Sequence, residues 1–382
     1  MIKRPFWEKR IKDSWKKAPI IWLSGPRRCG KTTLAKMLSV DNPVYVNCDL
    51  PSSGDMLKNP ELFFRDCAKK TVIFDEIHNL KDPAATLKIG ADMFPDIKIL
   101  ATGSSTLAAG KKFRDTLTGR KRNVRLLPVL YGELDLFGGA GLEKRLLHGG
   151  LPQAVLSDEK DFSFYREWAD SFFSRDIQKL FGFRDWEKFN LLFEYIMRQS
   201  SGLFDASKAA SSAGLSRSTV GAHLSAMETT GAVALIRPFS GGGRGELVKM
   251  PKVYGFDTGF VSFFRGWETL RPPDKGVLWE HLVLESLMAF NPDSRIMYWR
   301  DKSGREIDFV VQGDHGQADT FECKWNPDEF SPDALKVFRK NYPKGSNYVI
   351  CPISTEYKRN YDGLVAEVTD ITRMPGSGLH RK

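Results

Sequence analysis

Three short apolar runs in the first third of the chain alternate with stretches of helical character. The runs PIIWL (19–23), TVIF (71–74) and IKILAT (97–102) are continuously hydrophobic or nearly so. Such runs are typical of strands buried in a parallel sheet. The segment TTLAKMLS (32–39) between them has helical spacing of apolar positions. The pattern predicts a doubly wound α/β domain over residues 1–140, with its ligand site at the carboxyl ends of the strands.

The pattern changes after residue 140. Residues 141–200 carry large apolar side chains at helical spacing, which predicts a helical linker or lid. Residues 201–262 follow the order helix, glycine turn, helix and two strands around the loop SGGGRG, which is typical of a winged helix. Residues 263–382 predict a further α/β domain, with EIDFVVQ and DTFECKW as the two strands of a hairpin.

Composition and charge narrow the class of protein. The chain has 382 residues, 41% hydrophobic and 27% charged, as expected of a soluble globular protein. No apolar segment approaches the roughly 18 residues that span a bilayer, and the basic start, residues 1–17, predicts an amphipathic helix rather than a signal peptide. Five scattered cysteines without a CxxC pair favour the reducing cytoplasm and no structural zinc. The net charge of +10 favours an anionic partner such as nucleic acid, with DNA preferred.

A glycine-bounded loop lies between the first predicted strand and helix. Residues 25–32 match G-x-x-x-x-G-K-[ST], and the flanking strand and helix are the context that this motif requires. Backbone N–H groups of such a loop surround phosphates, its lysine reaches the outer phosphates, and its threonine hydroxyl binds Mg²⁺. The loop therefore predicts ATP and Mg²⁺. The predicted nucleotide contacts are Gly25, Pro26, Arg27, Arg28, Cys29, Gly30, Lys31, Thr32 and Thr33.

Two acidic residues follow the second predicted strand. Asp75 at its carboxyl end is expected to bind the magnesium ion together with Thr32, and Glu76 is expected to polarise the attacking water. The third predicted strand ends in short polar side chains that either contact the terminal phosphate or only form a turn. They are Thr102, Ser104 and Ser105.

Two later arginines are candidates for the same site. Arg120, in TGR, is a candidate arginine finger that acts in cis or toward a neighbouring subunit of a homo-oligomer, although a solvated basic loop also explains it. Arg175, in SRDI, is expected to face a nucleotide or to form a surface ion pair with Asp176 or its neighbours.

The second helix of the predicted winged helix carries a polar, weakly basic face. This composition favours phosphate contact over base reading, and a purely structural packing module is the alternative. The residues expected on the exposed face are Ser216, Arg217, Ser218, His223 and Ser225.

The predicted hairpin near the carboxyl end brings acidic residues together. Asp308 and Glu322 are expected side by side, and strand alternation places Lys324 on the face of Glu322. Glu280 lies on a helix among apolar positions, so its carboxylate is expected to point inward and to be a fourth residue of the site. The carboxylates Glu280, Asp308 and Glu322 predict a Mg²⁺ or Mn²⁺ site, with Lys324 steadying a water for phosphodiester cleavage. The alternative is an inactive ion-pair cluster.

Several of these motifs together resemble a known family. GPRRCGKTTL, VIFDEIH, ATGSS, LPVLYGE, SRDI, LWEHLVLESL, YWRDKSGREIDFVV and FECKW are similar to the prokaryotic AAA+ family ATPases whose carboxyl-terminal domain of unknown function resembles PD-(D/E)XK nucleases. The resemblance implies an AAA+ fold with ATP and magnesium, a winged helix and a nuclease-like end. It predicts an ATPase coupled to a nuclease-like domain acting on DNA. The alternative is a nucleotide-dependent regulatory switch whose inactive nuclease-like domain binds protein or nucleic acid.

Overall fold

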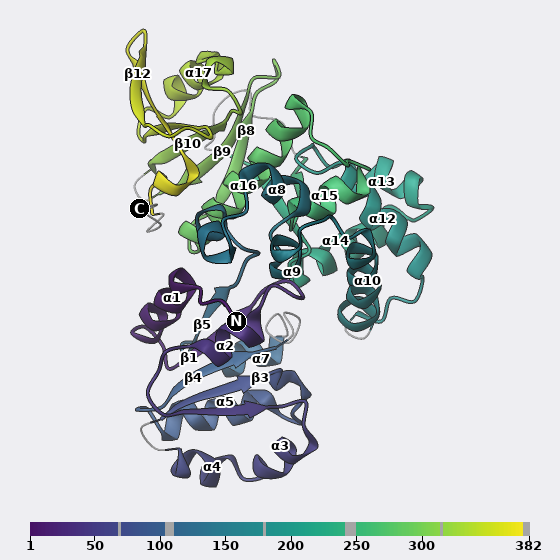
Figure 1. Ribbon diagram of the computed structural model, residues 1–382, viewed down its shortest axis with the longest axis vertical. Coiled ribbons are helices and arrows are strands. Elements are labelled where there is room, and N and C mark those ends of the chain that lie inside the picture. The colour runs from purple at the N-terminus through teal and green to yellow at the C-terminus, as the bar shows by residue number, and fades with distance from the viewer. Residues whose placement is uncertain (68–69, 104–110, 179–180, 241–249, 314–315, 377–382) are drawn as a thin grey trace. The chain divides into compact units, whose positions relative to one another are not determined.

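The chain forms two compact units in a computed structural model (Figure 1). The structure describes residues 1–67, 70–103, 111–178, 181–240, 250–313 and 316–376. The first unit comprises Met1–Pro128, Asp170–Phe183 and Thr229–Gly231. The second unit comprises Val129–Ala169, Arg184–Glu228 and Ala232–Lys382.

A five-stranded parallel sheet forms the centre of the first unit. Its order is β2-β3-β4-β1-β5. The strands are β1 Ile20–Ser24, β2 Pro43–Asn47, β3 Thr71–Asp75, β4 Lys98–Thr102 and β5 Lys121–Arg125. The three predicted apolar strands are confirmed. The fifth strand, β5, is a basic segment. It lies at the edge of the sheet, where polar side chains reach water.

Helices supply the rest of the core of the first unit. They are α1 Pro5–Trp15, α2 Lys31–Met37, α3 Pro51–Met56, α4 Pro60–Asp66, α5 Pro83–Met93 and α7 Lys111–Thr116, with a short 3-10 turn η1 at Ile77–Asn79. The predicted amphipathic helix is confirmed in α1, which buries Trp7, Ile11 and Trp15 at intervals of four residues. Phe64 of α4 and Leu87 of α5 pack with the strands in one apolar cluster.

The second unit is rich in helices, as the sequence predicts. The helices between residues 129 and 230 are η2 Tyr131–Phe137, α8 Leu142–His148, α9 Pro152–Leu156, α10 Phe162–Phe172, α12 Trp186–Arg198, α13 Ala206–Ala213 and α14 Arg217–Thr230. A π-helical turn, η3 Phe173–Gln178, follows α10 and belongs to the first unit. Later helices are α15 Thr258–Phe264, α16 Pro272–Phe290, η5 Pro327–Glu329, α17 Asp333–Asn341 and η6 Ile371–Arg373.

The predicted helix, turn and helix are present at α13 and α14. Gly214 ends α13 with a φ of 62°, a left-handed conformation that glycine adopts without strain. Just before α14, the hydroxyl of Ser216 accepts a hydrogen bond from the backbone N–H of Thr219 at 3.1 Å, as a helix N-cap does.

An eight-stranded mixed sheet dominates the second unit. Its order is β12-β13-β11-β10-β9-β8-β6-β7. The strands are β6 Val233–Pro238, β7 Lys252–Gly255, β8 Ile296–Arg300, β9 Glu306–Gln312, β10 Ala318–Cys323, β11 Asn347–Ile350, β12 Tyr357–Tyr361 and β13 Leu364–Thr369. The predicted antiparallel hairpin of β9 and β10 is confirmed.

The two strands expected in the wing have a second connection. β6 and β7 pair antiparallel, as in a wing, but β6 also pairs in parallel with β8 at Arg237 and Met297. The sheet therefore crosses the predicted boundary between residues 262 and 263. The loop expected at the wing tip, including Arg244, lies outside the described residues. The domain boundaries and the winged helix stay predictions.

Candidate functional site

The glycine-bounded loop follows β1 and opens α2, as predicted. Gly25 has a φ of +146°, and a Cβ atom there would lie 2.2 Å from the carbonyl oxygen of Leu126, so only glycine fits. Gly30 turns into α2 with a φ of 97°. The Nζ of Lys31 donates to the carbonyl oxygens of Gly25 and Pro26 at 2.9 and 3.1 Å. This lysine is therefore held within the loop, above the start of the helix.

Asp75 is buried at the end of β3 and accepts hydrogen bonds from three hydroxyl groups. Its Oδ1 accepts from Thr32 at 3.2 Å and from Thr102, and its Oδ2 accepts from Tyr45 at 2.6 Å. Burial and the neighbouring Asp75 raise the pKa of Tyr45, so the phenol stays a donor. Thr102 is fully buried, and it supports Asp75 instead of reaching a phosphate as one prediction had it. These three hydroxyl groups are neutral, so they satisfy the oxygens of Asp75 as hydrogen-bond donors without supplying a positive charge.

Glu76 follows Asp75 in a left-handed conformation, with a φ of 55°. Its backbone N–H donates to the hydroxyl of Thr102 at 3.0 Å, which fixes the turn. Its carboxylate lies 3.2 Å from Nδ1 of His78, and this contact lowers the pKa of Glu76 despite partial burial. Glu76 is therefore ionised at neutral pH, as a general base must be.

An ion pair joins the loop to the π-helical turn η3. The Nε of Arg27 donates to Oδ2 of Asp176 at 2.8 Å, and both residues belong to the first unit. Asp176 contacts the loop, so the expected surface pair between Arg175 and Asp176 is not found. Arg175 is exposed, and its other predicted contacts stay predictions. No local pattern predicts this contact, because 149 residues separate its partners.

Arg120 lies away from the loop. It directly precedes β5, whose first residue pairs with Ile20 at the start of β1, whereas the loop follows the far end of β1. Four residues of strand, about 13 Å at 3.3 Å per residue, separate these two edges. Arg120 donates twice to Asp92 of α5. The proposed cis role of Arg120 does not fit this position, and a role toward a neighbouring subunit stays a prediction.

Three of the remaining predicted nucleotide contacts lie in the loop or in the first turn of α2. Cys29 is fully buried, whereas Arg28 is exposed and has a φ of 61°. Thr33 is half-buried in the first turn of α2. Ser104 lies outside the described residues.

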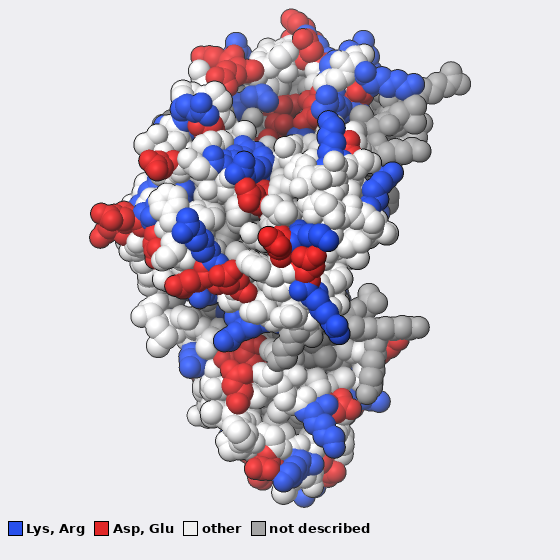
Figure 2. All heavy atoms as spheres, turned by 90° about the vertical axis from the view of Figure 1, so that its right-hand side faces the viewer, with Lys and Arg blue, Asp and Glu red and all other residues white. Residues whose placement is uncertain are grey.

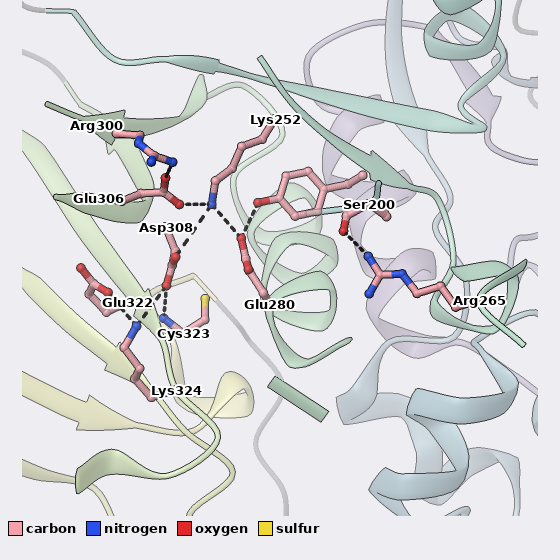
Figure 3. Close-up of polar contacts among 11 residues, drawn as sticks. Ser200, Lys252, Arg265, Glu280, Arg300, Glu306, Asp308, Glu322, Cys323 and Lys324 are labelled. Carbon is pink, nitrogen blue, oxygen red and sulfur yellow. Dashed lines mark hydrogen bonds and ion pairs between the residues drawn. The ribbon is translucent and has the colours of Figure 1, made fainter. Parts of the chain in front are cut away.

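Four carboxylates converge in the second unit (Figure 3). Glu280 comes from α16, Glu306 and Asp308 lie on β9, and Glu322 lies on β10. Glu306 and Asp308 are two residues apart and therefore lie on one face of the strand. The predicted convergence of Glu280, Asp308 and Glu322 is found, and Glu306 joins them.

A lysine that sequence reasoning missed lies among these carboxylates. Lys252 opens β7, and its Nζ lies 2.5 Å from Glu306, 3.1 Å from Glu280 and 3.9 Å from Asp308. Its side chain is only 5% exposed. Burial lowers the pKa of Lys252, but the surrounding carboxylates outweigh burial and raise it. Lys252 lies in a segment that the sequence predicts only as a strand of the wing.

Lys324 completes the cluster on the other side of Asp308. Its Nζ lies 3.1 Å from Glu322 and 3.7 Å from Asp308, and the N–H of Cys323 donates to Asp308 at 2.8 Å. Burial raises the pKa of Glu322 to about 8 and that of Glu280 to about 6. We call Lys252, Glu280, Glu306, Asp308, Glu322 and Lys324 the lysine–carboxylate cluster.

The donor set of this cluster does not fit the predicted metal. Within the described ranges, no three His, Cys, Asp or Glu side chains are arranged to hold a metal ion. The physical reason is that the oxygens of Glu280, Asp308 and Glu322 face ammonium groups. The three residues converge as predicted, but the predicted metal-ligand arrangement is not found.

Another carboxylate of α16, Glu285, is more enclosed than Glu280. Glu285 is buried against Arg145, whose side chain is fully buried. Arg145 also donates to the carbonyl of Val129 and the hydroxyl of Thr258. This arginine joins α8, α15 and α16 and serves packing.

The face of α14 is close to the prediction, with one correction. Ser216, Arg217, Ser218 and Ser225 are exposed. His223 is buried, with its ring 5.5 Å from that of Phe189, because it falls on the apolar side of the helix. On the face drawn in Figure 2, Lys and Arg side chains are interspersed with Asp and Glu instead of forming one continuous basic surface.

Comparisons with known proteins agree with the loop geometry. Residues 17–135 match the family model described as an AAA domain, residues 139–271 match a domain of unknown function (DUF8612), and residues 275–372 match another (DUF4143). The first unit therefore contains a P-loop AAA-type ATPase domain. No described helix has the length and apolar character needed to cross a membrane.

The similarity of the chain to other proteins extends beyond residues 17–135. Uncharacterized proteins of Mycobacterium tuberculosis and Mycobacterium bovis are each 24% identical over 321 residues, 82% of this chain and 72% of theirs. A Walker-type ATPase of Pyrococcus abyssi is 14% identical with a TM-score of 0.47, over 69% of this chain and 96% of that one. The RuvB Holliday junction branch migration motor of Thermotoga maritima is 15% identical with a TM-score of 0.32, over 61% and 89%.

Proposed function

We propose that the first unit hydrolyses ATP with Mg²⁺, by in-line attack of water on the terminal phosphoryl group. The observation that carries this proposal is the 3.2 Å contact between the hydroxyl of Thr32 and the carboxylate of Asp75. A loop threonine and a strand-end aspartate are the two protein groups that hold magnesium in P-loop ATPases. The ion, when bound, neutralises charge on the phosphates.

The other residues of the site have distinct tasks in this reaction. Lys31 must leave the carbonyls of Gly25 and Pro26 to bind the outer phosphates, which replace those oxygens as acceptors. Glu76 is ionised and accepts a proton from the attacking water or orients it. The loop N–H groups bind phosphate oxygens.

The test is phosphate release from ATP with Mg²⁺ or with a chelator present. Thr32→Val removes the hydroxyl and keeps the side-chain volume, and we expect it to lose Mg²⁺-dependent hydrolysis. The matched variant Thr32→Ser keeps the hydroxyl and should retain activity. Equal hydrolysis by the wild type and Thr32→Val would refute the site.

We further infer that the second unit binds nucleic acid, with DNA favoured, and does not cleave it. Exposed Ser216, Arg217 and Ser218 lie at the amino end of α14, where side-chain donors and the helix dipole favour phosphate. In the lysine–carboxylate cluster, the ammonium of Lys252 contacts the carboxylates that a catalytic metal ion would need. This arrangement favours binding of nucleic acid without cleavage. The other reading, a metal-dependent nuclease acting on DNA, rests on the convergence of Asp308, Glu322 and Lys324.

A direct experiment separates these readings. The full chain is incubated with DNA and with RNA, with and without ATP and Mg²⁺ or Mn²⁺, and both phosphate release and strand cleavage are followed. We expect ATP hydrolysis and binding without cleavage. Cleavage that disappears in Asp308→Ala would instead establish the nuclease.

The course of the chain offers a way to couple ATP hydrolysis to nucleic-acid binding. The segment Asp170–Phe183 belongs to the first unit, but the chain on both sides of it belongs to the second. Asp176 within this segment holds Arg27 of the ATP loop. We propose that the nucleotide changes this contact and with it the affinity of the second unit. Equal DNA affinity in ATP, in ADP and without nucleotide would refute the coupling.

A further inference from the structure

The lysine–carboxylate cluster already contains a cation at its centre. Lys252 contacts Glu280 of α16 and both Glu306 and Asp308 of β9, as Figure 3 shows. These residues come from three elements that are distant in the sequence. Lys252 is therefore the group at which the strand β7, the helix α16 and the strand β9 meet.

The charges of the cluster are almost balanced without a metal. Its four carboxylates face Lys252, Lys324 and the guanidinium of Arg300, which lies 3.0 Å from Glu306. Four negative and three positive charges leave one negative charge when all are ionised. Adding a divalent ion would leave an excess positive charge in a largely buried space, which is unfavourable.

Geometry also opposes a metal at this place. Magnesium binds carboxylate oxygens at about 2.0–2.1 Å in near-octahedral geometry, usually with one or two carboxylates and several waters. The oxygens of Glu280, Glu306 and Asp308 that would bind such an ion face the ammonium of Lys252. Tyr254 donates a further hydrogen bond to the same oxygen of Glu280. Lys252 would have to leave before a metal could enter.

We propose that Lys252 is the permanent internal cation of this cluster and lies where a metal ion held by Glu280 and Asp308, two of the three predicted ligands, would lie. The cluster binds no divalent metal while Lys252 is present, and removal of Lys252 creates a metal site. This inference is independent of ATP hydrolysis, and its test uses protein without nucleotide. It gives the physical reason for binding without cleavage.

Terbium luminescence provides the test, because Tb³⁺ prefers carboxylate oxygens and Tyr254, bonded to Glu280, can sensitise its emission. Every protein is full-length and carries Asp75→Asn, so that the nucleotide site contributes little. In this background we compare the unaltered cluster with Lys252→Met, Lys252→Arg, Asp308→Asn and the pair Lys252→Met with Asp308→Asn. Mn²⁺ competition reports the affinity.

We expect tyrosine-sensitised emission in Lys252→Met, with Mn²⁺ binding at least about tenfold tighter than in the unaltered cluster, or about 1.4 kcal/mol. Lys252→Arg keeps the cation and should gain nothing, and adding Asp308→Asn to Lys252→Met should abolish the gain. Mn²⁺ should raise the melting temperature of Lys252→Met alone.

Two results would overturn the proposal. One is a folded Lys252→Met, judged by circular dichroism, that gains no Tb³⁺ or Mn²⁺ binding. The other is metal binding by the unaltered cluster that disappears in Asp308→Asn. The comparison of the unaltered cluster with Asp308→Asn keeps Lys252 in place. It therefore tests the proposal even if Lys252→Met fails to fold. Equal, weak emission from the unaltered cluster and Asp308→Asn supports the proposal in that case.

Discussion

Asp75 and Asp308 are both strand carboxylates shielded from water, one in each sheet, and they differ in the charge of their partners. Asp75 accepts hydrogen bonds from the hydroxyls of Thr32, Tyr45 and Thr102. Asp308 lies within 4 Å of the ammonium groups of Lys252 and Lys324. The comparison teaches that the partners of a carboxylate, more than the number of carboxylates, decide whether a site can accept a cation.

The difference has an energetic basis. A neutral hydroxyl satisfies a carboxylate oxygen but leaves its negative charge, which a magnesium ion can then neutralise. An ammonium group removes that charge, and separating a buried pair to admit a metal costs several kcal/mol. Asp75 is thus suited to magnesium, whereas Asp308 is suited to a structural ion pair.

The largest effect is expected at the nucleotide site. Lys31→Ala should abolish tight ATP binding and with it hydrolysis, because Lys31 is the loop residue expected to reach the outer phosphates. Fluorescent nucleotide binding and phosphate release measure this. Lys36→Ala, a lysine of the same helix outside the motif, is the control and should behave as the wild type. Tight ATP binding by Lys31→Ala would show that Lys31 is not the group that binds the outer phosphates.

The next effect concerns the stability of the second unit. Lys252→Met leaves buried carboxylates without their cation and should lower the free energy of unfolding by about 3–5 kcal/mol, measured by urea denaturation. The matched control is Lys336→Met, which removes a 2.7 Å ion pair with the exposed Asp362. The control should lose at most about 1 kcal/mol. Equal losses would mean that the Lys252 pairs are as weak as surface pairs.

Asp308→Ala should have a smaller effect on stability. It removes the acceptor of the Cys323 N–H and one partner of Lys324, and we expect a loss of about 1–3 kcal/mol. ATP hydrolysis should stay at the wild-type rate, because the two sites lie in different units. A large fall in phosphate release by the folded variant would contradict this separation.

Glu76→Gln should separate nucleotide binding from turnover. The amide cannot accept the proton of the attacking water, so we expect hydrolysis at least about tenfold slower while ATP binding persists. Single-turnover phosphate release measures the step. Turnover at the wild-type rate in Glu76→Gln would show that Glu76 does not act on the attacking water. Asp75 would then be the carboxylate of the site that remains assigned.

The smallest effect is expected at the exposed face of α14. Arg217→Ala should weaken DNA binding equally for all sequences and reduce the salt dependence of binding by about one phosphate contact. Titrations at several salt concentrations, with Arg237→Ala of the neighbouring hairpin as a comparison, measure the slope. Affinity indifferent to salt would contradict phosphate contact.

The nucleotide site could be predicted from the sequence because its parts are local. The loop requires glycine at Gly25 and Gly30, and the short apolar strand before Asp75 fixes the end of the sheet where the carboxylate lies. The hairpin of β9 and β10 is likewise local, so the approach of Asp308 to Glu322 followed from strand alternation.

Only the tertiary structure decided what these residues contact. Lys252 reaches Asp308 because β6 pairs with both β7 and β8, and this register joins segments of chain that no local pattern connects. The same holds for the contact of Asp176 with Arg27, which lies 149 residues away, and for the contact of Arg120 with Asp92 of α5. The sequence by itself determined the motifs and the strands that carry them. Long-range pairing determined the charge around each carboxylate, because the energy of a buried charge depends on every neighbour within a few ångströms.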